Sequence, residues 1–358
     1  MHIFYLIALI GLGLIIFIHE FGHFIAGKII GLKVKEFMFG LPGPRIFSFR
    51  VGETEYGATA LPFGGYVKFA GVESELQLEE DDEDKDTPPE RKYDTQPRWK
   101  KAIIMFAGPF MNMVLPIFLI AIMLMFQGVP DRTNVIGEVV KAGPAAKAGL
   151  HAGDKIITVE GKKVKNWAQA VTIIKKKPGK EITIVAERNG KTQIFRPVLD
   201  NNKGEGFLGI SQRLRTPLPH EALYQGFLTT LTIIKFMAVT LYVVITQKIG
   251  LLAKDSAGPV RIVYESAKII QQNFWSYIWL LALISINIGI VNLLPIPPLD
   301  GGRLAILGIE GIKRGPINKK AVFAINAAGM ALLLALMVYF VFSDIFKIIQ
   351  GAPFPGGG

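Results

Sequence analysis

The sequence contains no cysteine among its 358 residues. Disulfide bonds and thiolate metal sites are therefore excluded, and histidine, aspartate and glutamate remain as the strong metal ligands. Charged residues are also scarce, at 19%, whereas half of the residues are hydrophobic. Several uncharged runs exceed the roughly 20 residues needed to cross a bilayer, which excludes a soluble globule. We expect an α-helical polytopic membrane protein in a lipid bilayer.

The first apolar run, residues 1–30, lacks the basic start and the small-residue cleavage site of a secretory signal peptide. We therefore expect it to be retained as a membrane span. Three further spans are expected within residues 99–130, 272–302 and 303–350. A fifth apolar stretch, residues 222–247, is interrupted by Lys235 and leaves two interpretations open, a span or an interfacial or re-entrant helix.

Residues 31–72 alternate apolar and polar side chains between Gly-Pro and Gly-Gly turns, which predicts a membrane-associated β-hairpin element. Because open strand edges are not tolerated in lipid, these strands should pack against protein or line a wet cavity. The following residues 73–98 are rich in acidic side chains and predict a solvated cytoplasmic loop. The glycine- and proline-rich tail, residues 351–358, is expected to be disordered.

Residues 131–212 show short strand patterns and a helical pattern over residues 166–175, which predicts an inserted soluble α+β domain. Amphipathic or interfacial helices are expected in residues 213–271. The net charge of +11 is concentrated around the soluble domain, where residues 131–220 hold 17 basic and 8 acidic side chains. These bases lack interleaved aromatic residues, so a solvated surface is favoured over a nucleic-acid partner.

His19-Glu20-Phe21-Gly22-His23 lies near the end of the first apolar run. On a helix, imidazoles at i and i+4 share a face and can bind one Zn²⁺, while the glutamate activates a water molecule. The alternative is a pair of hydrogen-bonded core histidines. Ionisable groups inside a membrane cost roughly 2.5–3.5 kcal/mol on insertion scales, so they rarely occur there without a partner or a task.

A catalytic zinc usually has three protein ligands, and Asp300 is the best third candidate. It follows three prolines that stop the third span, and two glycines after it permit a sharp turn. The alternative is an ordinary helix end with a solvated aspartate. Asp300 reaches the side of His19 and His23 only if residues 222–247 do not cross the membrane. Lysine and arginine residues flank the spans on that side, which makes it cytoplasmic by the positive-inside rule.

These residues belong to a set of motifs spread along the chain. In chain order, the motifs are His19-Glu20-Phe21-Gly22-His23, Leu61-Pro62-Phe63-Gly64-Gly65-Tyr66-Val67-Lys68, Phe106-Ala107-Gly108-Pro109 with Asn112, Ser256-Ala257-Gly258-Pro259, and Asn292 through Gly302. With this set the chain resembles the site-2 proteases, which are zinc metalloproteases that cut within membranes, and more closely their bacterial regulator-of-sigma-E protease branch, here with a single PDZ domain.

The resemblance implies one catalytic Zn²⁺ bound by His19, His23 and Asp300, with Glu20 as the general base. It also implies that the β-hairpin element holds the substrate in an extended form, because a helical substrate must unwind before cleavage. The residues implied in substrate binding are Asn292, Gly64, Gly65, Pro295 and Pro297.

The soluble segment resembles a circularly permuted PDZ domain of the bacterial kind, through residues 143–150 and 152–157. The resemblance implies a groove for a peptide C-terminus at Gly206, Phe207, Leu208, Gly209 and Ile210. PDZ grooves add a peptide strand to a sheet edge, although a filter or a structural spacer are alternatives.

The sequence thus predicts an intramembrane zinc endopeptidase of a bacterial cell membrane. Its active site is expected near the cytoplasmic face and its PDZ domain on the extracytoplasmic side. Expected substrates are single-span membrane proteins, such as anti-sigma factors or remnant signal peptides. A non-proteolytic PDZ-containing receptor or scaffold is the main alternative. A transporter is disfavoured, because the ionisable groups gather at one end of the membrane region instead of following several spans.

Overall fold

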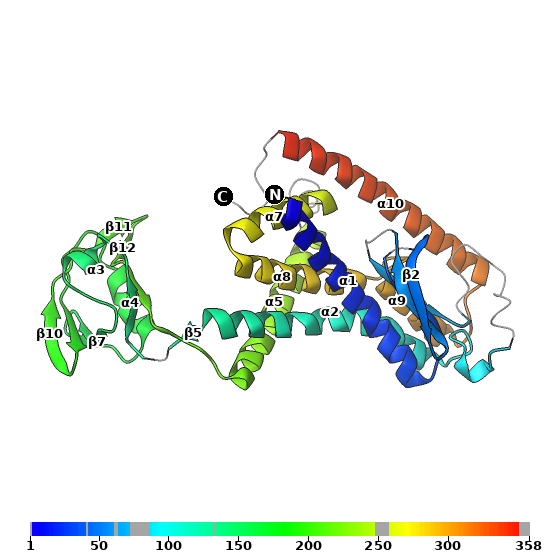
Figure 1. The fold of residues 1–358 in the computed structure, drawn as a ribbon, viewed down its shortest axis with the longest axis horizontal. Helices are drawn as coiled ribbons and strands as arrows, with labels where there is room; N and C mark the ends of the chain where they lie inside the picture. Colours follow the sequence, from blue (N-terminus) through cyan, green and yellow to red (C-terminus); the bar gives the residue numbers. More distant parts are fainter. Residues whose placement is uncertain are drawn as a thin grey trace. The chain divides into compact units, whose positions relative to one another are not determined.

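The computed structural model describes residues 2–40, 42–60, 64–71, 86–131, 133–247 and 258–350. The chain divides into two compact units, of which one combines Met1–Ala121 with Leu223–Gly358 and the other is Ile122–Ala222. Figure 1 follows the chain through both units. The predicted disordered tail and residues 73–85, the first half of the predicted acidic loop, lie outside the described residues.

In its described residues, the first unit is built mainly from long helices and one sheet. Its helices are α1 (His2–Ile30), η2 (Pro89–Arg91), α2 (Arg98–Gln127), α5 (Pro219–Gln247), α7 (Pro259–Gln272), α8 (Phe274–Asn292), α9 (Asp300–Lys313) and α10 (Lys319–Ile349). Among the described residues, α1, α2, α5, α8 and α10 are long and apolar enough to cross a membrane. The set includes α5, so length and composition alone do not distinguish this helix from the four expected spans.

The sheet of the first unit consists of β1 (Val34–Phe39), β2 (Arg45–Val51), β3 (Thr54–Thr59) and β4 (Gly65–Phe69). Its strand order is β2-β3-β1-β4. Only β2 and β3 form a tight hairpin, because β1 pairs in parallel with β3 and antiparallel with β4. The predicted strands are therefore present, in a mixed sheet instead of consecutive hairpins. The edge strand β2 is exposed along its whole length.

Helices α1, α2 and α8 pack together through small residues and apolar side chains. Gly22 of α1 lies so close to the Ala107 carbonyl of α2 that an added Cβ would come within 2.3 Å of its oxygen. The Tyr277 hydroxyl of α8 donates to the Ile7 carbonyl of α1 at 3.0 Å. One buried apolar cluster joins the first half of α1 to the second half of α2 and to α8. Helices α1 and α2 are therefore antiparallel neighbours.

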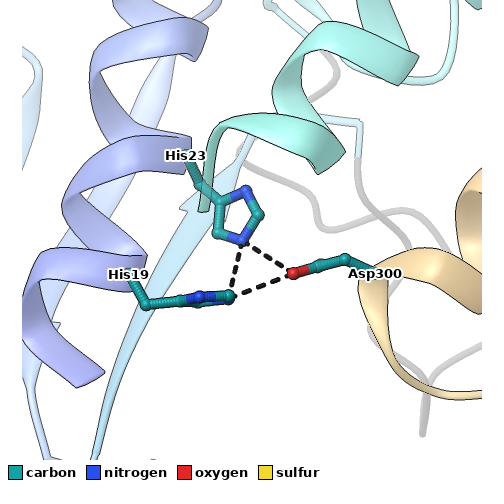
Figure 2. Close-up of side chains that lie close together, drawn as sticks. All are labelled: His19, His23 and Asp300. Atoms are coloured by element: carbon teal, nitrogen blue, oxygen red, sulfur yellow. Dashed lines mark hydrogen bonds and ion pairs between the residues drawn. The ribbon is translucent and has the colours of Figure 1, made fainter. Parts of the chain in front are cut away.

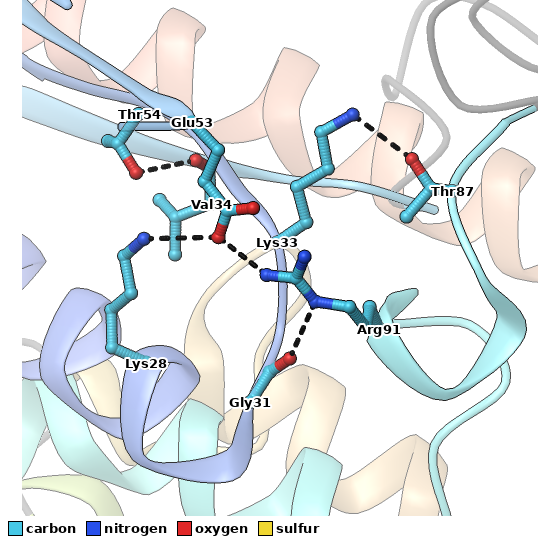
Figure 3. Close-up of polar contacts among 8 residues, drawn as sticks. All are labelled: Lys28, Gly31, Lys33, Val34, Glu53, Thr54, Thr87 and Arg91. Atoms are coloured by element: carbon cyan, nitrogen blue, oxygen red, sulfur yellow. Dashed lines mark hydrogen bonds and ion pairs between the residues drawn. The ribbon is translucent and has the colours of Figure 1, made fainter. Parts of the chain in front are cut away.

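A polar cluster anchors the sheet to the end of α1 (Figure 3). Glu53, between β2 and β3, pairs with Arg91 at 2.6 Å and with Lys28 at 3.4 Å. The Arg91 hydrogen bond is the main reason why the pKa of Glu53 is lowered. The Thr54 hydroxyl donates to the Val34 carbonyl at 2.8 Å. Through Glu53, Arg91, which follows the sheet in the chain, is thereby linked to Lys28 at the end of α1.

The amphipathic helix α7 is held at two places. The Tyr5 ring of α1 stacks on Tyr264 of α7, with 6.4 Å between the ring centroids. At the start of α7, the buried Asp344 carboxylate of α10 accepts from the backbone N–H groups of Gly258 and Arg261, both at 3.0 Å. Helix α7 is therefore fixed beside the first half of α1.

The second unit has its own buried apolar core. Its elements are β5 (Val129–Pro130), β6 (Ile136–Val139), α3 (Pro144–Lys147), β7 (Lys155–Val159), β8 (Lys162–Lys163), α4 (Trp167–Lys175), β9 (Ile184–Arg188), β10 (Lys191–Phe195), β11 (Asp200–Asn202), β12 (Glu205–Phe207), β13 (Ile210–Gln212) and β14 (Leu214–Arg215). The main sheet has the order β10-β9-β7-β8. The pattern over residues 166–175 correctly predicted α4, which begins after Asn166, whose side chain caps it by accepting from the Gln169 N–H.

Candidate metal centre

His19, His23 and Asp300 bring three potential ligand atoms together, although Asp300 is 281 residues from His19 in the sequence. Figure 2 shows both imidazoles on α1 pointing towards the carboxylate at the start of α9. His19 Nε2 lies 3.0 Å and His23 Nε2 lies 3.4 Å from Asp300 Oδ2, and the two nitrogens are 3.3 Å apart. Both histidines are buried.

Two of these three separations match a tetrahedral zinc site, and the His19–Asp300 separation is about 0.3 Å shorter. Zn–N and Zn–O bonds of about 2.0–2.2 Å at tetrahedral angles place neighbouring ligand atoms roughly 3.3–3.5 Å apart. The chemical identity of the atoms also fits, because two imidazoles and one carboxylate leave a fourth position open, as in catalytic zinc sites. Among the described residues, this is the one group of three such side chains close enough to hold an ion.

Asp300 reaches the histidines because the chain turns sharply between α8 and α9. The prolines after Asn292 end α8, since proline cannot continue the backbone hydrogen-bond ladder. Gly301 then allows the first turn of α9 to pack on this segment, because an added Cβ would lie 2.3 Å from the Leu293 carbonyl. The Asp300 carboxylate therefore extends from the first turn of α9, which packs closely against the segment that follows α8.

A cavity of about 290 Å³ opens beside the three ligand atoms. It is lined by His19, Glu20, His23, Val67, Phe69, Tyr93, Met105, Asn292, Pro298, Leu299, Asp300 and Arg303. Glu20 therefore faces the same space as the three ligands, and so does Asn292. Burial raises the pKa of Tyr93 to about 12, which keeps its phenol neutral at the cavity wall.

The other residues implied in substrate binding lie at different distances from this cavity. Gly65 of β4 is next to Glu20, because an added Cβ would lie 3.2 Å from Glu20 Cγ. Gly64 precedes it at a φ of +98°, and its carbonyl accepts from the Gly40 N–H. Pro295 and Pro297 do not line the cavity, whereas the neighbouring Pro298 does.

Helix α2 contributes contacts that the sequence analysis did not assign. The Ile104 carbonyl accepts from His23 Nδ1 at 2.7 Å. One turn later, Gly108 faces both imidazoles, and an added Cβ would lie 2.3 Å from His23 Nε2. A further turn later, the buried Asn112 side chain lies 3.3 Å from His19 Nδ1. Gly108 and Asn112 both belong to the motif Phe106-Ala107-Gly108-Pro109 with Asn112, which was the available signal, although neither residue was assigned a role from the sequence.

In the second unit, the residues of the predicted peptide groove lie on β12, on β13 and in the turn between them. The Leu208 carbonyl accepts from the Ala145 N–H at 3.0 Å and the Gly209 carbonyl accepts from the Val140 N–H at 2.8 Å. Gly206 packs against α4, where an added Cβ would lie 2.2 Å from the Ile174 carbonyl oxygen. The strand after this turn, β13, pairs with β6, and its first residue, Ile210, packs against the core of the unit.

Comparisons with known proteins give matches over almost the whole chain. The model of peptidase family M50 matches residues 7–336. A Clostridium perfringens protein whose designation includes the words zinc metalloprotease is 33% identical, over 94% of this chain and 97% of its own length. The zinc metalloprotease RasP of Shouchella clausii is 31% identical, over 94% of this chain and 97% of its own length.

The regulator of sigma-W protease RasP of Bacillus subtilis is 28% identical, over 94% of this chain and 96% of its own length. Among solved structures, the PDZ domain of an SdrC-like protein from Listeria monocytogenes is similar to part of the chain, at 26% identity and a TM-score of 0.21. That match covers 24% of this chain and 90% of the domain. The family model and the full-length relatives agree in their chemistry: the chain belongs to peptidase family M50, the site-2 proteases, and is a zinc metalloprotease.

Proposed function

We propose that His19, His23 and Asp300 hold the catalytic zinc and that Glu20 is the general base of an intramembrane endopeptidase. The observation that carries this proposal is the convergence of the three ligand atoms beside a cavity that Glu20 also lines. When bound, zinc polarises a carbonyl group and acidifies water, which makes peptide hydrolysis feasible near neutral pH.

The side chains around the cavity perform the remaining steps. Glu20 takes a proton from the attacking water and afterwards protonates the leaving amine. Asn292 offers an amide donor towards the scissile carbonyl, in the manner of an oxyanion hole. The apolar wall formed by Val67, Phe69 and Met105 limits access of bulk water, because those side chains cannot hydrogen-bond to it.

We further propose that the substrate binds in an extended form along β4. Within the described residues, β4 is an edge strand that pairs with β1 alone. Gly65 at its start is next to Glu20, and Val67 lines the catalytic cavity. A peptide that adds to this edge has its backbone fixed by hydrogen bonds to the strand. A transmembrane helix can form these bonds only after it unwinds and gives up its own internal backbone hydrogen bonds. Single-span membrane proteins are therefore the proposed substrates.

The topology is proposed to contain four spans, with α5 not crossing as a single span. Helix α5 begins against the second half of α2, where an added Cβ on Gly226 would lie 2.5 Å from the Ile117 carbonyl oxygen. Helix α7, which leads into α8, packs against the first half of α1. Because these two places belong to the same end of the helix bundle, the chain between them makes an even number of crossings.

The charge distribution supports a cytoplasmic position for the catalytic end. Lys28 lies in the last turn of α1, and a basic run including Lys100 lies in the first turn of α2. At the other side of the site, Lys313 is the last residue of α9 and Lys320 lies in the first turn of α10. By the positive-inside rule, this end of the bundle lies at the cytoplasmic face of a bacterial cell membrane. The second unit is then proposed to be an extracytoplasmic PDZ domain that binds peptide C-termini at residues 206–210.

Glu20→Gln tests the proposed base, because it removes the carboxylate without changing the ligand set. We expect the variant in liposomes to bind one zinc but to cleave a single-span reporter about 10²–10⁴ times more slowly. Glu265→Gln on α7, whose carboxylate lies 3.9 Å from Lys268 and outside the cavity, is the matched control and should cleave normally. Retained cleavage in Glu20→Gln would refute the proposed role.

A non-proteolytic receptor or scaffold is not favoured. Relatives over nearly the full length are named as proteases, and the cavity combines a ligand set with a glutamate that a peptide binder does not need. A chelator control in the same liposome assay distinguishes the two functions, since metal removal should stop cleavage.

A further inference from the structure

We propose that Asn112 is a positioning residue that holds His19 in the tautomer able to bind zinc, by accepting a hydrogen bond from His19 Nδ1–H. The proposal rests on the ligand set proposed above and adds a partner that acts through His19. Asn112 is fully buried on α2, and the structure gives its side chain one hydrogen-bond partner, His19 Nδ1 at 3.3 Å.

The two histidines differ in how their second nitrogen is satisfied. His23 Nδ1 faces the Ile104 carbonyl at 2.7 Å, and a carbonyl can only accept. His23 therefore carries its proton on Nδ1, which leaves a lone pair on Nε2, the atom that points to Asp300. The backbone of α2 thus fixes the tautomer of one ligand without any contribution from a side chain.

Among the described residues, the partner of His19 Nδ1 is the Asn112 side chain and not a backbone carbonyl. In the structure the amide nitrogen of Asn112 faces His19 Nδ1, and Asn112 Oδ1 is buried without a partner among the described residues. This arrangement suits a His19 that accepts at Nδ1 and carries its proton on Nε2, towards Asp300. Such a tautomer cannot bind a metal through Nε2.

Rotation of the amide by 180° exchanges its oxygen and nitrogen, which have nearly the same shape. The oxygen then accepts from His19 Nδ1–H, and Nε2 is left with a lone pair for the ion. An asparagine can therefore serve His19 in both tautomers, whereas the Ile104 carbonyl serves His23 in only one. Zinc-bound histidines generally donate their other N–H to such a partner, which orients the ring.

One hydrogen bond between α2 and α8 at this point does not involve the Asn112 side chain. It uses the backbone, since the Ser285 hydroxyl donates to the Asn112 carbonyl at 2.8 Å. Substitution of the Asn112 side chain leaves this bond available, and Ser285→Ala removes the bond while keeping the amide. Ser285→Ala is therefore the matched control for packing at the same point of the helix interface.

The test compares Asn112→Leu, which can neither donate nor accept, with Asn112→Asp, which as a carboxylate can only accept. Full-length proteins are purified in detergent, and zinc affinity is measured by competition with a chromogenic chelator. We expect Asn112→Leu to bind zinc about 10–100-fold more weakly, the range typical for lost partners of ligating histidines. Asn112→Asp and Ser285→Ala should stay within about threefold of the wild type, because both keep an acceptor at His19.

The visible absorption of the cobalt-substituted protein provides a second readout, because it reports ligand geometry and not stability. It should change in Asn112→Leu and be retained in Asn112→Asp and Ser285→Ala. The proposal is overturned if Asn112→Leu keeps both the affinity and the spectrum. It is also overturned if Asn112→Asp loses as much affinity as Asn112→Leu, since the amide would then act as a donor. Asn112→Ala replaces the leucine variant if the latter does not fold.

His19→Ala separates this proposal from the one on which it rests. If His19→Ala keeps wild-type zinc affinity, the ligand set is wrong. If His19→Ala loses zinc and the Asn112 variants do not, the ligand set stands and the assignment of Asn112 is wrong.

Discussion

Gly108→Ala is expected to abolish tight zinc binding while leaving the fold intact. A Cβ at this position of α2 would lie 2.3 Å from His23 Nε2 and 2.9 Å from His19 Nε2. Favourable contacts between heavy atoms need roughly 3.5 Å or more, so His23 or the helix must move by about 1 Å. The site would have to deform at the two nitrogens that are proposed to bind the ion.

The magnitude follows from the narrow tolerance of metal coordination. Zinc–ligand distances in real sites stay within about ±0.2 Å of their usual values, so a displacement of about 1 Å removes or badly distorts one ligand. We expect zinc affinity to fall at least about 100-fold, which corresponds to roughly 2.7 kcal/mol. The helix itself should not be weakened, because alanine is favoured over glycine in a helix interior by about 0.8–1.0 kcal/mol.

The assay combines chelator competition for zinc with thermal unfolding in excess chelator. Gly108→Ala should bind zinc weakly and fail to cleave a membrane reporter, yet unfold near the wild-type temperature when both proteins are metal-free. Gly308→Ala on α9 is the matched control, because an added Cβ there meets no atom within 4 Å. A Gly108→Ala protein with wild-type zinc affinity would refute the proposed position of the ion.

Two further predictions concern buried carboxylates away from the metal centre. In the second unit, Asp154 is 1% exposed and accepts two hydrogen bonds from Arg188, at 2.6 and 2.7 Å. Burial opposes its ionisation, but Arg188 holds the pKa of Asp154 below its ordinary value. Its stabilising contribution should be complete above the unfolded pKa of about 3.9 and be lost as the pH falls through the lower folded pKa. Denaturant unfolding at pH 7 should show a loss of about 1.5–3 kcal/mol for Asp154→Asn, and a loss that does not shrink at pH 3 would contradict this account. Asp344→Ala should destabilise the first unit by about 0.5–2 kcal/mol in thermal unfolding, since it leaves the start of α7 uncapped, and an unchanged midpoint would count against that contact.

Local patterns made much of the site predictable. The i and i+4 spacing of His19 and His23 fixes their shared helix face, and the prolines before Asp300 fix where α8 must end. The membrane spans are evident because an uncharged apolar run of about 20 residues has the length that a helix needs to cross the hydrocarbon layer. The meeting of Asp300 with the histidines followed from topology, once residues 222–247 were assumed not to cross.

Other features depend on contacts that no local pattern encodes. The parallel pairing of β1 with β3 is one example, because strand periodicity carries no information on the choice of partner. The contribution of α2 to the metal centre is another. Gly108 leaves room for the two imidazoles because it has no Cβ. Asn112 contacts His19, which is 93 residues away in the sequence. Neither property can be identified before the helices are packed.

The separation of 281 residues between His19 and Asp300 has a consequence for biosynthesis. During translation, the histidines leave the ribosome and enter the bilayer long before the aspartate is made. With the ligand set proposed above, a nascent or prematurely terminated chain that stops before α9 holds two of the three ligands, and we expect it to be hydrolytically inert. On this proposal, newly made enzyme gains activity towards membrane proteins only after most of its own helices have been inserted and assembled.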